Sequence, residues 1–197
     1  MELDAPDLYN DYVSMVPLTA ELYCALREAG GMEFIWQSLP AIPKGTGYTD
    51  YYKYMVRRNN DSCIYPYAVL DRLDADRFVG VAAFVKPHRT HRRVRFGYTW
   101  LNPDVRGTHL FAALKHLMIR RALNWGARRI EAFVDSQHEA AIQGMLNIGA
   151  QQEGVLRQYQ KSAEGIWVDI AVLSLLRDEA KRALEQLEKQ LSLEVPA

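Results

Sequence analysis

Hydrophobic and polar positions alternate between β-type runs and helical patterns along nearly the whole chain. Residues 12–18 predict a first strand, and Thr19 is a suitable N-cap for a helix that a glycine pair ends. Three β-type runs follow at 64–70, 78–86 and 94–101, and short polar turns separate them. This spacing predicts an antiparallel meander.

A tyrosine-rich segment, YTDYYKYMVRRN, lies between the first helix and the meander and predicts a second helix. Tyr48, Tyr51, Tyr52 and Met55 have the spacing of one helix face. Two interpretations stay open. This face packs into the core, or some of its rings join Trp36 to line a substrate pocket.

The segment 95–110, RFGYTWLNPDVRGTHL, joins the third strand of the meander to a long helix. A turn at Asn102 and Pro103 follows the strand, and the sequence Arg-Gly-Thr leads into a helix that begins near Leu110. Such a junction directs unpaired N–H groups and the positive end of a helix dipole at one point. It therefore predicts a phosphate-binding site.

The remaining pattern completes a single α/β domain. The long helix has a predicted core face, formed by Leu114, Leu117, Met118, Ala122 and Trp125, whereas His116, Arg120 and Asn124 are expected to face away. Further elements are a strand at 130–134, a helix at 138–149, a hairpin of strands at 155–160 and 166–176, and a C-terminal helix at about 178–192. That last helix has a narrow leucine stripe, which suits packing on its own domain, our preferred interpretation, or on a partner subunit.

Composition restricts the class of protein. With 197 residues and zero formal charge, the chain is expected to form one domain over residues 1–197, without a general attraction to nucleic acid or membranes. The two cysteines, the absence of a signal peptide pattern and the absence of a long apolar run predict a cytoplasmic protein with no membrane span. The basic run at 88–93 is expected to be a solvated hairpin tip, because no stacking aromatics are interleaved with it.

The order of elements resembles the GNAT superfamily of N-acetyltransferases, and within it the RimJ and RimL group, over about 13–179. The resemblance rests on GYTWLNPDVRGT at 97–108, on Leu114 and Lys115, and on later segments. These are ARRI at 127–130, Asp135, IGA at 148–150, EGVLR at 153–157, Asp169 and Ser174. It implies a mixed, largely antiparallel central sheet flanked by helices.

The resemblance also implies a function, which is the transfer of an acetyl group from acetyl-CoA to an amine acceptor without a metal. Strand 97–102 would separate from its neighbour and pair with the pantetheine arm, while the loop N–H groups hold the pyrophosphate. The expected cofactor-binding residues are Trp100, Leu101, Arg106, Gly107, Thr108, His109 and Leu110. Trp36, Tyr51 and Tyr52 are expected at the substrate, and the protein is expected to be a monomer or homodimer.

The sequence departs from the family pattern at several site positions. His109 stands where the loop usually has glycine, Arg95 where a glutamate is common, and His138 and Ala141 where an asparagine and a serine are usual. His138 and Tyr98 are the candidate catalytic residues, because imidazole and phenol can exchange protons. Glu131, Asp135 and Tyr159 are further candidates, and the sequence does not rank them. The alternatives are a catalytically silent binding or regulatory protein, or an acyltransferase with another acyl donor, such as an acyl carrier protein.

Overall fold

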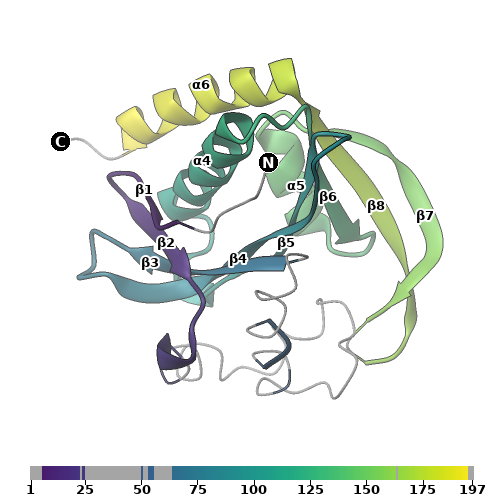
Figure 1. Ribbon diagram of the computed structural model, residues 1–197, viewed down its shortest axis with the longest axis horizontal. Coiled ribbons are helices and arrows are strands. Elements are labelled where there is room, and N and C mark those ends of the chain that lie inside the picture. The colour runs from purple at the N-terminus through teal and green to yellow at the C-terminus, as the bar shows by residue number, and fades with distance from the viewer. Residues whose placement is uncertain are drawn as a thin grey trace.

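The structure, a computed structural model, describes residues 6–22, 24, 50, 53–55, 64–162 and 164–194. Its strands form one sheet in the order β1-β2-β3-β4-β5-β6-β8-β7 (Figure 1). The bounds are β1 Leu8–Tyr9, β2 Val13–Pro17, β3 Ile64–Asp71, β4 Arg77–His88, β5 Arg93–Leu101, β6 Arg129–Asp135, β7 Gln151–Lys161 and β8 Trp167–Leu176. Every neighbouring pair is antiparallel except β5 and β6. The predicted mixed, largely antiparallel sheet is confirmed.

Three α-helices of the described residues, α4 His109–Asn124, α5 Glu139–Asn147 and α6 Arg177–Glu194, pack on one face of the sheet (Figure 1). Side chains of alternate strand residues meet these helices in one cluster, the helix-side core. Its members include Phe84, Val94, Phe96, Ile130 and Leu173. None of the helices in the described ranges is both long and apolar enough to cross a membrane.

The opposite face of the sheet carries a second core. Strand residues that alternate with those of the helix-side core meet Leu18 and Met55 there. The strand members include Ala83, Val85 and Trp100. The β5 strand therefore lies between two apolar layers, which explains why its sequence is hydrophobic on both sides.

Most of the predicted elements that fall within the described residues are observed, with three differences, whereas most of the predicted helix after Thr19 and of the tyrosine-rich helix lies outside them. A short strand, β1, precedes the first predicted strand, and β7 begins at Gln151 rather than at 155. His116 was expected to face away from the core but is only 7% exposed, because β1 and α6 cover that side of α4. The C-terminal helix packs on its own domain, with Leu187 and Leu191 buried in the helix-side core.

Candidate active site

The parallel strands β5 and β6 pair over only part of their length. Their register runs from Arg93 opposite Arg129 to Phe96 opposite Ala132, and it stops there. Beyond this point β5 continues to Leu101 beside β4, and β6 continues to Asp135 beside β8. We call the two separated segments, 97–101 and 133–135, the fork. The segment 97–101 pairs with β4 on one edge, but among the described strands none pairs with its other edge beyond Phe96, so the peptide groups of that edge are available to an extended ligand.

A β-bulge lies inside the fork. Tyr98 and Thr99 together stand opposite the single residue Ala82 of β4, and Tyr98 has a φ of 49°. Such a bulge increases the local twist and turns side chains to new directions. As a result Tyr98 packs with the second core, where its ring centroid lies 6.4 Å from that of Tyr54.

Glycine at position 80 of β4 allows this close strand geometry. A Cβ atom on Gly80 would overlap the carbonyl oxygen of Trp100, a backbone atom that cannot move aside independently of β5. The bulge and the approach of β4 to the end of β5 therefore depend on a residue without a side chain.

The loop after β5 is held by hydrogen bonds to its neighbours. Asn102 donates its backbone N–H to Val79 O over 2.8 Å, and a 3₁₀ turn, Pro103–Val105, follows. Arg106 Nε donates to Leu101 O over 3.0 Å, which folds this exposed side chain back along the strand end. These contacts fix where the chain enters α4.

The N-terminus of α4 has the features of an anion site. Gly107 has a φ of 74°, a backbone conformation that favours glycine, and Thr108 is the N-cap. The Thr108 hydroxyl donates to Val105 O over 2.7 Å and accepts from the Leu110 N–H over 3.3 Å. Among the described residues, no backbone acceptor is present for the N–H groups of Gly107, Thr108 and His109. Free N–H groups at the positive end of a helix dipole favour a phosphate.

His109 is turned away from these loop N–H groups. Its ring lies edge-on to Tyr12, with the centroids 5.7 Å apart, and its Nε2 is buried without a hydrogen-bond partner in the described part of the chain. The concern raised by the sequence was that an imidazole here would crowd a pyrophosphate. Because the ring packs against Tyr12, it does not occupy the space in front of the loop N–H groups where a pyrophosphate would bind.

The other predicted site residues differ in whether their side chains are accessible to a ligand. The side chains of Trp100, Leu101 and Leu110 are buried in the two cores, so these residues offer a ligand only their backbone atoms. His138 is exposed at the N-cap of α5 and follows β6 directly; its backbone N–H donates to Asp135 O over 2.9 Å. His138 and Tyr98 come from different elements, the N-cap of α5 and the bulge of β5. The predicted substrate residues Trp36, Tyr51 and Tyr52 lie outside the described residues.

Glu131, a candidate base, is bound by arginines. It is 7% exposed, and its carboxylate lies 2.8 Å from Arg129 Nε, 3.7 Å from Arg95 Nη2 and 3.8 Å from Arg93 Nη1. Arg95 also stacks on the ring of Phe133, with its guanidinium carbon 3.3 Å from the ring centroid. Burial lowers the pKa of Arg95, and Glu131 opposes that shift. The carboxylate of Glu131 is therefore engaged by arginines on β5 and β6 and is not a free group.

A second ion pair continues this network onto β7. Arg129 donates to both carboxylate oxygens of Glu153, over 2.7 and 2.5 Å, and Ser174 Oγ donates to the same carboxylate over 2.7 Å. These hydrogen bonds, that from Arg129 first, lower the pKa of Glu153 to about 2. The pairing explains Arg129 of ARRI and Glu153 of EGVLR as a connection between β6 and β7.

Lys115 is a site feature that the sequence reasoning missed. It is 4% exposed and lies within the run of buried residues on α4. Its Nζ lies 5.5 Å from the ring centroid of Phe96 and 5.3 Å from that of Phe111. The available signal was its place next to Leu114 in an apolar helix, where a charged residue is unusual.

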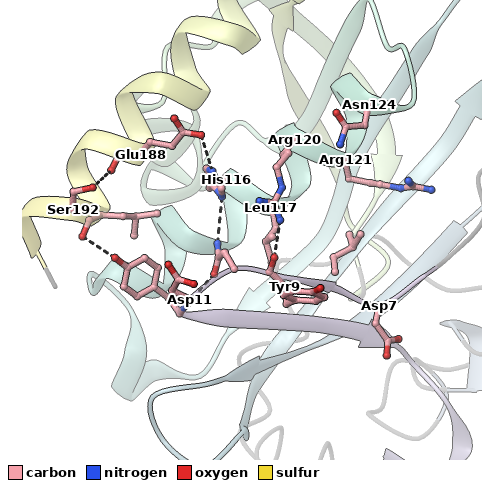
Figure 2. Close-up of a pocket in the computed structure, with 14 residues that line it drawn as sticks. Asp7, Tyr9, Asp11, His116, Leu117, Arg120, Arg121, Asn124, Glu188 and Ser192 are labelled. Carbon is pink, nitrogen blue, oxygen red and sulfur yellow. Dashed lines mark hydrogen bonds and ion pairs between the residues drawn. The ribbon is translucent and has the colours of Figure 1, made fainter. Parts of the chain in front are cut away.

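A separate hollow of about 780 Å³ lies on the helix side, between β1, the second half of α4 and α6 (Figure 2). Asn10 Oδ1 accepts from the N–H groups of Tyr12 and Val13 over 3.0 and 2.8 Å, so its amide nitrogen faces His116 Nδ1 at 3.3 Å. The ring therefore accepts at Nδ1 and donates from Nε2 to Glu188 over 3.3 Å. These contacts fasten the N-terminal segment to α4 and α6. The hollow includes none of the predicted site residues.

Known structures share this fold. A GCN5-related N-acetyltransferase from Brucella melitensis has a TM-score of 0.87, with 17% identity, and the alignment covers 100% of this chain and 88% of that one. RimJ of Mycobacterium smegmatis, solved with CoA-disulfide, has a TM-score of 0.74 and 16% identity over 92% of each chain. The fold expected from the RimJ resemblance is confirmed.

Sequence comparison leads to the same family. The N-acetyltransferase YoaA of Bacillus subtilis strain 168, itself uncharacterised, is 29% identical over 108 residues, which are 55% of this chain and 60% of that relative's length. The model of the acetyltransferase (GNAT) family matches residues 31–145, which include β5, the fork and α4. The protein that carries this fork and loop therefore belongs to the acetyltransferase (GNAT) family.

Proposed function

We propose that the protein is an N-acetyltransferase that moves an acetyl group from acetyl-CoA to a primary amine, either a protein N-terminus or a small amine. The observation that carries the proposal is the fork, which continues directly into the phosphate-type loop at the start of α4. An extended pantetheine arm suits the free edge of 97–101, and a pyrophosphate suits the N–H groups of 107–109.

The chemistry follows from this arrangement. The arm would align the thioester in the fork, and the uncharged amine attacks its carbonyl carbon. The amide bond forms, the carbon–sulfur bond breaks, and the amine loses a proton. We assign this proton exchange to His138, which is exposed at the end of β6, or to Tyr98, which is turned by the bulge.

Calorimetric titration with acetyl-CoA and CoA tests the proposal. A ligand present at about 100 times its dissociation constant stabilises a protein by about 2.7 kcal/mol, so a thermal shift is a second readout. The absence of binding at millimolar CoA would refute the proposal. His109→Gly should bind CoA at least as tightly as the wild type, because the imidazole packs against Tyr12 and makes no contact that the loop N–H groups need; clearly weaker binding would make the imidazole a ligand contact.

The two proton-exchange candidates are separated by substitution. His138→Ala should abolish turnover and leave CoA binding unchanged if the imidazole carries the proton, and Tyr98→Phe should do so if the phenol does. Each variant that retains wild-type turnover removes its residue from the mechanism.

One observation favours a second candidate function, a CoA-binding protein without turnover. Glu131 is engaged with three arginines, and Arg95 stands where a glutamate is common in the family. The carboxylate of Glu131 is therefore already occupied by ion pairs within the described part of the chain. Tight CoA binding by the wild type, without acetylation of any amine in a panel of peptides and polyamines, would support this candidate.

A further inference from the structure

Lys115 is only 4% exposed, and its ammonium group has no anionic partner among the described residues. Nζ lies 5.5 Å from the ring centroid of Phe96 on β5 and 5.3 Å from that of Phe111 on α4, and no carboxylate of the described residues forms an ion pair with it. Ring faces attract a cation weakly compared with a carboxylate. A buried charge is costly unless it is paired, so this position indicates a partner that arrives with a ligand.

The position of the ammonium group relates it to the fork. Phe96 is the last residue of β5 that pairs with β6, so Nζ lies at the level where the two strands separate. Phe111 lies in the first turn of α4 and packs against α5, since a Cβ atom on Gly144 would be 3.1 Å from its ring. Lys115 is therefore on the helix side of the fork, between α4 and α5.

The proposed function fixes which end of CoA would come near this group. If the pyrophosphate binds at 107–109 and the arm runs along β5 from Leu101 toward Gly97, then the sulfur lies at the closed end of the fork. That end is marked by Phe96, which contacts Lys115. The sulfur is also the atom on which negative charge develops when the acetyl group leaves.

We propose that Lys115 supplies the positive charge that stabilises the thiolate of CoA as it leaves, an inference that rests on the proposed function. In this step the amine nitrogen bonds to the carbonyl carbon, and the carbon–sulfur bond breaks with its electron pair on sulfur. The amine proton passes to the proton-exchange group or to water. Lys115 keeps its own proton and acts by charge alone.

The protonation of Lys115 agrees with this role. Burial lowers its pKa from the ordinary 10.5 to about 8, so most of the side chains are charged at pH 7. A thiolate close to Nζ favours the charged form and raises this pKa again. Anion and cation therefore stabilise each other when the ligand is bound.

The test compares CoA with desulfo-CoA, which lacks the sulfur, in binding titrations at pH 7.5. Lys115→Met should weaken binding of CoA by about tenfold or more, as expected for loss of a charge-assisted contact. The same variant should bind desulfo-CoA within about twofold of the wild type, because the contact concerns sulfur. Lys189→Met removes an exposed lysine of α6 and is the matched control.

A pH series adds a readout that simple packing would not change. In the wild type, CoA affinity should rise between about pH 7 and 8 as the thiolate forms beside the ammonium group, whereas desulfo-CoA affinity stays flat. In Lys115→Met the rise should be absent. Equal CoA affinity and equal pH profiles in both proteins would overturn the inference alone. Failure of the wild type to bind CoA at all would overturn the proposed function, and the inference with it.

Discussion

Replacement of Lys115 by methionine is expected to stabilise the ligand-free protein at neutral pH. Methionine keeps the unbranched chain between Phe96 and Phe111 and makes favourable sulfur–aromatic contacts, but it removes the buried charge. The pKa of Lys115 falls from 10.5 to about 8 on folding. At about 1.4 kcal/mol for each pKa unit, the charged lysine costs about 3 kcal/mol of unfolding free energy.

The sign and the pH window follow from proton linkage. A lysine with a lowered pKa in the folded state carries its full penalty below pH 8, where it is protonated both folded and unfolded. The penalty decreases between pH 8 and 10.5, because the folded protein loses the proton first. The advantage of Lys115→Met over the wild type should therefore shrink from about 3 kcal/mol at pH 7 to about 1 kcal/mol at pH 10.

Urea unfolding followed by circular dichroism measures this difference. The wild type, Lys115→Met and Lys189→Met are compared at pH 7 and pH 10, so that all other titrating groups cancel between the proteins. The Lys189 variant, which changes an exposed residue, should match the wild type within about 0.5 kcal/mol. The reasoning is refuted if Lys115→Met is no more stable than the wild type at pH 7, or if its advantage does not shrink by pH 10.

Three further predictions concern the fork and its surroundings. Gly80→Ala should lower the free energy of unfolding in urea by about 1–3 kcal/mol, because the new Cβ atom would overlap a carbonyl oxygen of β5. Gly154→Ala is the control and should be near neutral, because the space around Gly154 is open. Equal effects of the two substitutions would contradict this account of the packing. Gly107→Ala should lower the free energy of unfolding by about 1 kcal/mol, because the residue has a positive φ, and it should also weaken CoA binding in titrations. If stability and CoA affinity are both unchanged, the loop tolerates a side chain. Arg129 lowers the pKa of Glu153 in the folded state, so the wild type loses stability as the pH falls from 4.5 toward 2. Glu153→Gln should remove this acid-dependent loss. An unchanged acid unfolding curve would exclude the contribution of Glu153.

The order of strands and helices could be read from the sequence because each long element carries its own period. The α4 pattern shows this, since Leu114, Leu117 and Met118 are buried as predicted. The basic turn also agrees with its prediction, because Arg89 and Arg92 are exposed between β4 and β5. The strand β1 could not be found in this way, because two residues are too short to show a period.

The candidate site was only partly readable. The loop from Arg106 to Thr108 was placed correctly before α4, because glycine and a capping threonine act locally in the chain. The state of Glu131 was not readable, because two of the arginines that hold it come from β5 and only Arg129 comes from β6 itself. The sequence showed only a carboxylate near the end of a strand, and the packing of β5 against β6 showed that arginines bind it.

By itself, then, the sequence determined the local elements, the antiparallel meander and the junction that leads into α4, because hydrophobic period, turn residues and caps act over a few neighbours. The mixed sheet was expected only from the family resemblance. Only the tertiary structure decided the rest. His116 and Lys115 became buried because β1, α6 and the rings of β5 and α4 cover sides of α4 that its own pattern leaves open. The fork likewise appears only in the sheet, where β6 stays paired with β8 as far as Asp135 while its pairing with β5 ends at Phe96, a difference that no single segment of the sequence shows.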